Sequence, residues 1–209
     1  MSRTTPTLSR DIAVATAIRI LDAEGAGALT MRRVTREMGV PLMSLYRHVP
    51  SKDALEAAVV ETLMESFPAV PRSRAWETRI ANWARAYRTV VRAHPNAAPL
   101  LASHPTAGYG ARAAEVDAML GCLEDAGLTP RDARVRLRAA IMTITGFCNT
   151  QAQAEQAGET APGPDARPAG DLPHLAAFMD DVRHRRHRDD IFAAMVASVI
   201  AGIAAALAR

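Results

Sequence analysis

The sequence predicts an all-α protein, and three observations support that prediction. The 209 residues are 49% hydrophobic but only 4% aromatic, a composition rich in Ala and Leu that favours close-packed helices over sheets. Apolar residues recur three and four positions apart along most of the chain. Capping residues and prolines stand where the apolar stretches begin and end. No segment shows the alternation of a strand, and no internal repeat is visible.

Four helices are expected in the first 67 residues, after an N-terminal arm over residues 1–8. The first should run from Ser9 to about Glu24, with a core stripe at helical spacing. Two short helices follow over residues 29–50, and a fourth follows over residues 51–67. Side-chain oxygens can cap helix starts, and glycine and proline end helices. The residues expected to do so here are Ser9, Gly25, Thr30, Gly39, Pro50, Ser51 and Pro68.

The two short helices over about residues 29–50 have the spacing of a helix-turn-helix. A turn of three or four residues containing Gly39 separates them, as that motif requires. Leu45 and Val49 should face the core, because so short a helix must bury one side. The second helix of such a unit lies in the major groove of DNA. Residues 1–67 are therefore predicted to form a DNA-binding head.

Several side chains of this unit are suited to contact DNA. Leu42 and Met43 begin the second helix, where no core should be in reach, and could touch thymine methyl groups. An arginine fork suits phosphate or guanine, and Lys52 beside the N–H groups of a helix start suits phosphate. Tyr46 could instead belong to the core, and the arginines could form a solvated face. The candidates are Thr30, Arg32, Pro41, Leu42, Met43, Ser44, Tyr46, Arg47 and Lys52.

The remaining residues, 68–209, are predicted to form one helical bundle behind a Pro-rich joint at 68–74. Helices are expected over 75–94, 108–126, 129–157, 174–183 and 189–208, with a short helix and loop over 96–107. Thr129 followed by Pro130 and Asp132 is a strong helix start. Residues 158–173 are rich in Gly, Pro and charge and are expected to form a mobile loop.

Two of these helices, 129–157 and 189–208, are apolar on more than one face. One stripe suffices for burial within a domain, so the second face predicts self-association. The residues assigned to that dimer interface are Ile141, Ile144, Val196, Val199, Ile200, Ile203 and Leu207. Residues 191–208 carry no charge, but their many alanines make a poor membrane span. A buried helix is expected there, and no membrane partner.

The middle helices could enclose a pocket, because aromatic, Met and isolated polar residues interrupt an Ala-rich bundle. Each of these residues alone is as well explained by simple packing. No catalytic constellation, phosphate loop or metal-ligand spacing stands out, so neither a metal nor a cofactor is expected. The candidate liners are Trp83, Tyr87, Leu101, His104, Met119, Leu123, Met142, Thr145, Phe147, Gln151 and Met179.

The stretch LTMRRVTREMGVPLMSLYRHVPSKDAL, with AIRILDAEG upstream, resembles the N-terminal domain of the tetracycline-repressor (TetR) family. The helix order downstream, including EDAGLTPRDA before a long helix and an apolar last helix, is similar to the tetracycline-repressor branch. The resemblance implies phosphate contacts at Thr30, Tyr46 and Lys52, and base contacts at Arg32, Leu42, Met43, Ser44 and Arg47. It also implies that helices 129–157 and 189–208 of two subunits form a four-helix dimer interface.

The expected function is that of a homodimeric, ligand-responsive regulator, a repressor that binds a palindromic operator in double-stranded DNA. A sequence pI of about 9.3 suits a polyanionic partner. The N-terminus has no secretory signal, and two cysteines without metal or redox spacing are typical of a cytoplasmic protein. The effector is expected to be small, hydrophobic or aromatic, and metal-independent, with His104 as the nearest alternative metal ligand. A DNA-packaging protein without effector and a small helical enzyme remain as alternatives.

Overall fold

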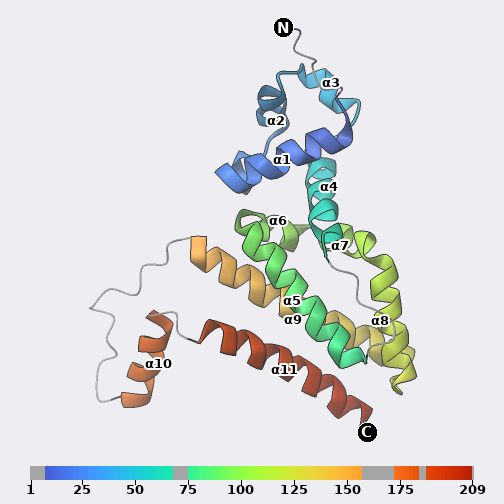
Figure 1. Cartoon of the computed structure of the whole chain (residues 1–209), viewed down its shortest axis with the longest axis vertical. Coiled ribbons are helices and arrows are strands. Elements are labelled where there is room, and N and C mark those ends of the chain that lie inside the picture. Colours follow the sequence, from blue (N-terminus) through green and yellow to red (C-terminus); the bar gives the residue numbers. More distant parts are fainter. Residues whose placement is uncertain (1–7, 68–74, 157–171, 184–186, 209) are drawn as a thin grey trace.

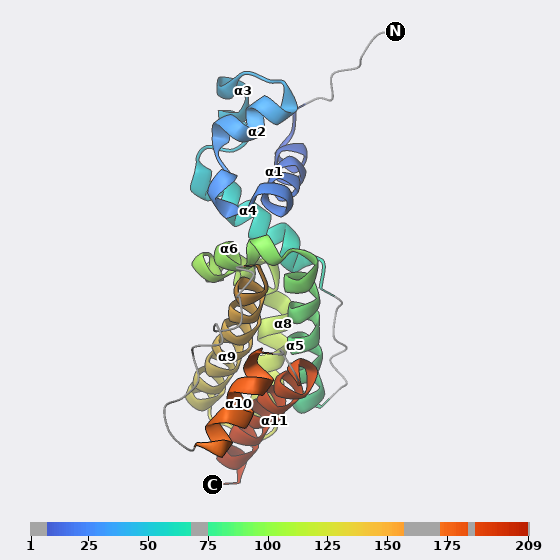
Figure 2. The same cartoon turned by 90° about the vertical axis from the view of Figure 1, so that its left-hand side faces the viewer.

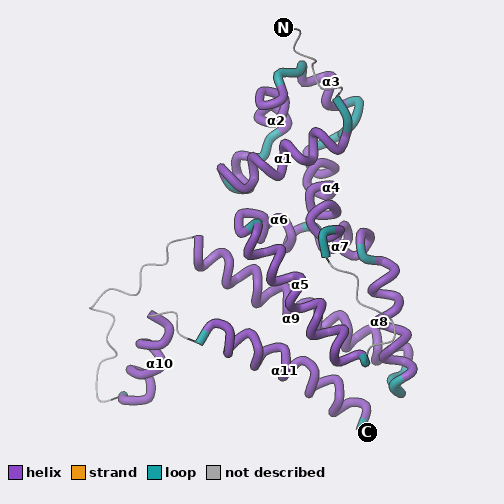
Figure 3. Tube along the Cα trace, viewed as in Figure 1, coloured by secondary structure: helices purple, strands orange, loops and turns teal. Residues whose placement is uncertain are grey.

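The computed structural model describes residues 8–67, 75–156, 172–183 and 187–208. Every regular element in these ranges is a helix, as Figure 3 shows, so the all-α prediction is confirmed for them. The head stands at one end of an elongated molecule and the C-terminal helix at the other (Figure 1). The predicted arm, the Pro-rich joint and most of the predicted 158–173 loop lie outside the described residues.

The head consists of α1 (Arg10–Glu24), the short 3₁₀ turn η1 (Ala26–Ala28), α2 (Met31–Met38), α3 (Leu42–Tyr46) and α4 (Lys52–Glu65). The predicted caps are confirmed, because the hydroxyls of Ser9, Thr30 and Ser51 each accept a bond from a first-turn N–H. Gly39 ends α2 in the left-handed conformation, with φ 67°. Leu45 and Val49 are buried, as their spacing predicted. Sequence signals therefore determine the local geometry of the head.

The bundle begins with α5 (Trp76–Ala93), followed by the 3₁₀ turn η2 (Pro95–Ala97), α6 (Ala98–Ser103), α7 (Pro105–Ala111) and α8 (Ala113–Asp125). The long helix α9 (Pro130–Gln156) starts at Thr129 as predicted, where the Thr129 hydroxyl accepts from the Asp132 N–H at 3.1 Å. The predicted continuous helix 108–126 is wrong, because the chain breaks at Arg112. Its first part belongs to α7, which packs on α4 of the head, with Gly108 close to Met64.

Head and bundle meet at several places besides the α4–α7 packing, and one of them joins α1 to η2. His94 lies 3.0 Å from the carboxylate of Asp22, and the Asn96 amide donates to the Asp22 carbonyl at 2.8 Å. Both groups lie in or beside η2, which packs against α1. Figure 2 shows α4 descending from the head toward the bundle. The head is therefore attached to the bundle by α4 and by the α1–η2 contact.

The last two helices are α10 (Pro173–Arg183) and α11 (Arg188–Leu207). Helix α11 packs along α5 and α9 and is held at its start by Arg88–Asp189 (2.7 Å) and Arg188–Glu155 (2.6 Å) ion pairs. By length and composition α11 could cross a membrane, with a mean hydropathy of 2.1, yet only 17% of that stretch is buried. The outer face of α11 is therefore open in the single chain, and its predicted burial depends on the predicted second copy.

One buried charge in the bundle stands out. The side chain of Arg79 on α5 is fully buried, and none of its three nitrogens has an acceptor among the described residues. Burying a charged group without a partner costs several kcal/mol in real proteins (order of magnitude). We expect Arg79→Met to keep the aliphatic packing and raise Tm by about 2–4 °C for each kcal/mol gained. Thermal unfolding compared with the exposed control Arg85→Met measures this, and a lower Tm would mean that the guanidinium has a partner.

Candidate DNA-binding and effector-binding sites

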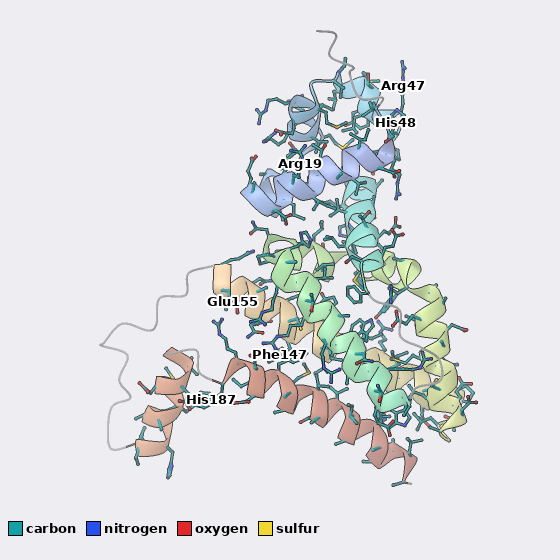
Figure 4. All side chains as sticks on the ribbon, viewed as in Figure 1. Arg19, Arg47, His48, Phe147, Glu155 and His187 are labelled. Atoms are coloured by element: carbon teal, nitrogen blue, oxygen red, sulfur yellow. The ribbon has the colours of Figure 1, made fainter. Side chains whose placement is uncertain are left out.

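The outer end of the head presents an exposed, basic and partly apolar surface around α3. Met43 is 71% exposed and Tyr46 is 40% exposed, whereas Leu42 and Ser44 are half-buried. Leu42 packs against the head's core, so the expectation that it had no core to reach is wrong. Figure 4 shows Arg47 beside His48 at this end of the molecule. The exposed candidates are Thr30, Arg32, Pro41, Met43, Tyr46, Arg47 and Lys52.

The head's arginines fall into two groups. Arg33 is held by Glu24 (2.5 Å) and Glu37 (2.9 Å), and its hydrogen bond is the main cause that lowers the pKa of the Glu24 carboxyl. The Arg33–Glu24 ion pair connects α2 to the end of α1. Arg32, Arg36 and Arg47 are exposed and have no hydrogen-bond or ion-pair partner among the described residues. These three remain available to bind phosphate or base edges.

Lys52 opens α4 next to its cap Ser51, where the helix dipole already favours an anion. Its ammonium lies 3.1 Å from Glu56 and its side chain is 51% exposed. A surface pair of this kind contributes little stability. Lys52 can therefore exchange Glu56 for a phosphate at small cost.

A cavity of about 470 Å³ lies in the bundle directly below the head. Its size suits a drug-sized molecule. It is bounded by the end of α4, by α5, α6, α7 and α8, and by one long face of α9. The first two liners, Val60 and Met64, belong to the helix that begins at Lys52. One helix thus connects the outer surface of the head with the wall of the cavity.

Two aromatic rings of α5, Trp83 and Tyr87, line one side of this cavity. Trp83 and Tyr87 stack with ring centroids 5.5 Å apart, and Phe67 meets the Tyr87 ring edge-on at 6.1 Å. The Tyr87 hydroxyl donates to the buried Asn149 amide oxygen at 2.9 Å. Burial is the main cause that raises the pKa of Tyr87. This wall can stack a flat apolar ligand, and the hydrogen-bonded Tyr87–Asn149 pair offers a polar group to orient it.

His104 stands between α6 and α7 at the top of the cavity. Its Nε2 lies 3.2 Å from Asp53 and 3.9 Å from Glu56, both near the start of α4. These three residues are the group among the described residues whose ligand atoms are close enough to hold a metal ion. A hydrogen bond from His104 to Asp53 explains the contact equally well. In either case His104 links the cavity to the start of α4.

Comparison with known proteins places this arrangement in a family. The model described as "Tetracyclin repressor-like, C-terminal domain" matches residues 67–207, and "Bacterial regulatory proteins, tetR family" matches residues 13–59. The chain belongs to the TetR family. That family is one of transcriptional regulators, as the resemblance of the helix-turn-helix stretch implied.

Relatives and solved structures agree with this membership of the TetR family. The HTH-type transcriptional repressor DrrR1 of Streptomyces coeruleorubidus is 33% identical over 68% of this chain and 52% of its own. The tetracycline repressor class A from transposon 1721 of Escherichia coli is 30% identical over 75% of this chain and 71% of its own length. The structure of a possible TetR family regulator from Streptomyces coelicolor A3(2) has a TM-score of 0.77 at 26% identity. The match covers 95% of this chain and 100% of that one. The chain spans about half the length of the first two curated relatives it matches.

Six of the eleven predicted pocket residues line the cavity of this TetR-family chain: Trp83, Tyr87, Leu101, His104, Met142 and Thr145. Five do not. Met119 lines a much smaller neighbouring cavity, and Leu123 is fully buried in the core. Phe147 packs on Phe192 of α11 at 6.1 Å, between α9 and α11 in Figure 4. Gln151 turns away from the cavity, and Met179 on α10 does not reach it.

The liners that sequence reasoning missed follow the turn of α9. Residues 138, 141, 142, 145, 146, 149, 150 and 153 line the cavity, and this spacing of three and four is one helical face. Thr145 and Phe147 are two positions apart and cannot share that face. The same phase, started from Thr145, would have found Arg138, Asn149 and Gln153. Tyr109 and Arg112 could not be found this way, because they lie at the unpredicted α7–α8 break.

None of the seven predicted dimer residues is fully exposed in the single chain. Ile144, Val196 and Ile203 are buried in their own core, Ile141 lines the cavity, and Val199, Ile200 and Leu207 are half-buried. The large side chains of α11 turn inward because α5 and α9 supply their apolar partners. The exposed face of α11 instead consists of small residues, with Ile191 at its start. These include Ala194, Ala197, Ser198, Ala201 and Gly202.

Proposed function

We propose that this chain is a homodimeric repressor whose hold on a palindromic DNA operator is released by a small apolar or aromatic effector. Residues 1–67 would be the DNA-binding head, and residues 68–209 the effector-binding and dimerisation domain. The observation that carries the proposal is α4, which starts at Lys52 on the head and lines the cavity with Val60 and Met64. The names of the relatives, a transcriptional repressor and a tetracycline repressor, support it.

The proposed mechanism is a change in the separation of two recognition helices. In a dimer both copies of α3 must meet major grooves about 34–36 Å apart, or a multiple of that spacing. An effector in the cavity touches α4 directly and α6–α7 around His104. If it fits better when the heads are too far apart, it shifts the population away from the DNA-bound state.

The outward surface of the bundle supports the dimer. Val135 and Met142 on α9 are 55% and 61% exposed, and Phe178 on α10 is 62% exposed. Exposed apolar side chains of this kind and the small-residue face of α11 are surfaces that a second copy would cover, and Met142 among them also lines the cavity. The family membership also supports a regulator acting on DNA in the cytoplasm and no enzyme. The burial that raises the pKa of the Cys148 thiol to about 12 disfavours its reactive thiolate form.

The test is binding of the full chain to the intergenic DNA beside its own gene. We expect a palindrome there to bind two chains with far higher affinity than random DNA, as fluorescence anisotropy and light scattering would measure. Equal affinity for random DNA would contradict the proposal and favour a packaging role.

The individual contacts can be separated by their salt dependence. Lys52→Ala should weaken binding to all sequences and reduce the slope of log K against log salt by about 0.9 for each subunit, because one fewer counterion is released. Met43→Ala, the matched control on α3, should change the preferred base and leave the slope unaltered. Anisotropy titrations over a salt series measure both, and an unchanged slope for Lys52→Ala would remove it from the phosphate contacts.

A further inference from the structure

The charges around the cavity are all of one sign. Among the described residues that line it, three can be cationic, Arg112, Arg138 and His104, and none is Asp or Glu. The carboxylates nearby stand behind these cations and do not line the cavity: Glu115 is bound to Arg112, while Asp53 and Glu56 face His104 from α4. Arg112 and His104 thus each contact a carboxylate, and Arg138 is the basic liner that does not.

The two arginines are placed differently. Arg112 is largely buried and fixed, because it donates to the Phe67 carbonyl at 3.1 Å, pairs with Glu115 and lies 5.4 Å from the centre of the Phe67 ring. Arg138 is exposed on α9 and has no ion-pair or hydrogen-bond partner among the described residues. It precedes Met142 by four residues and Thr145 by seven, so all three share the face of α9 that lines the cavity. Arg138 is thus an uncompensated guanidinium in the wall.

We propose that the effector is an organic anion: an apolar, flat body against Trp83 and Tyr87, with a carboxylate or similar acid group bound by Arg138. This proposal rests on the proposed function and names the chemical class of its ligand. A guanidinium fork matches a carboxylate or sulfonate with two parallel hydrogen bonds. Arg112 is already paired with Glu115, so Arg138 is the guanidinium left to bind the acid group. A cationic ligand would meet the unpaired Arg138 as repulsion and be disfavoured.

The experiment uses two dyes that differ only in the acid group, anilinonaphthalene sulfonate and neutral phenyl-naphthylamine. Both become fluorescent in apolar cavities. We expect the full-length protein to bind the sulfonate at least about tenfold more tightly, which corresponds to one charge-assisted contact. Arg138→Gln should remove that preference and leave the neutral dye's affinity unchanged. Arg134→Gln, an exposed arginine of the same helix that does not line the cavity, should preserve it.

Two results would overturn the proposal and leave Arg138 as an ordinary surface charge. One is equal affinity of the protein for the two dyes, and the other is an equal drop in affinity for the sulfonate dye in Arg134→Gln and Arg138→Gln. Operator affinity is measured in parallel without dye. Absence of specific operator binding would contradict the proposed function alone, because the dye preference would still report an anion site. Specific operator binding with no dye preference would contradict the anion site alone.

Discussion

Placing two carboxylates on the outer face of α11, as Ala197→Glu with Ala201→Glu, should give a monomer that binds its operator at least about 100-fold more weakly. Both positions are exposed in the single chain, so the change leaves the chain's own core intact. Four carboxylates would meet in the dimer at close range, and like charges at an interface cost several kcal/mol (order of magnitude). A monomer also loses the effective concentration that links the second half-site to the first.

Light scattering and anisotropy measure these two effects, with circular dichroism to verify that the helices remain. Ala114→Glu on the exposed surface of α8 is the control and should stay dimeric. Ile203 would be a poor choice for this test, because it is 2% exposed and its replacement would disrupt the core. A folded double variant that remains dimeric would show that α11 does not form the interface.

Filling the cavity should produce a repressor that no longer responds to its effector. Thr145 lies on the cavity face of α9 and its hydroxyl is satisfied within the helix, by the Met142 carbonyl at 3.3 Å. Thr145→Phe would place a ring in the space that the ligand occupies and should weaken dye binding at least about 100-fold. The overlap removes both the apolar contact and the room for it. Operator affinity should remain that of the parent protein, because α3 and Lys52 are untouched.

Thr145→Val is the matched control, because it keeps the volume and removes only the hydroxyl. It should retain the binding of anilinonaphthalene sulfonate within about threefold, since no direct ligand hydrogen bond is assigned to that hydroxyl. If Thr145→Phe binds the dye as tightly as Thr145→Val, the dye occupies another site and the assignment of this cavity is wrong.

Local chemistry made the head predictable from its sequence. The hydroxyls of Ser9, Thr30 and Ser51 determine where helices begin, and Gly39 must be left-handed where α2 turns into α3. Each of these signals acts within four residues and needs no knowledge of the rest of the chain. The start of α9 at Thr129 was predictable for the same reason.

The bundle was less predictable because its details depend on which helices meet. The break at Arg112 accompanies the packing of α7 on α4, more than forty residues away in sequence, and Gly108 and Gly110 just before it were the only local signal in the described sequence there. The inward turn of Val196 and Ile203 likewise depends on α5 and α9 supplying an apolar surface. Choosing pocket residues by type rather than by helical phase placed Phe147 in the wrong set, although the phase was available in the sequence.

The outer face of α11 also bears on which second chain would pair with this one in the proposed dimer. Residues 191–207 contain no charged side chain, and most of those facing outward are Ala, Ser or Gly. Such a surface lets two backbones approach closely, but it has no charge with which to reject a similar helix from a related regulator. In the proposed dimer, fidelity of pairing in a cell with many such proteins would therefore depend on side-chain shape, which the bulky exposed Ile191 at the start of α11 is placed to provide.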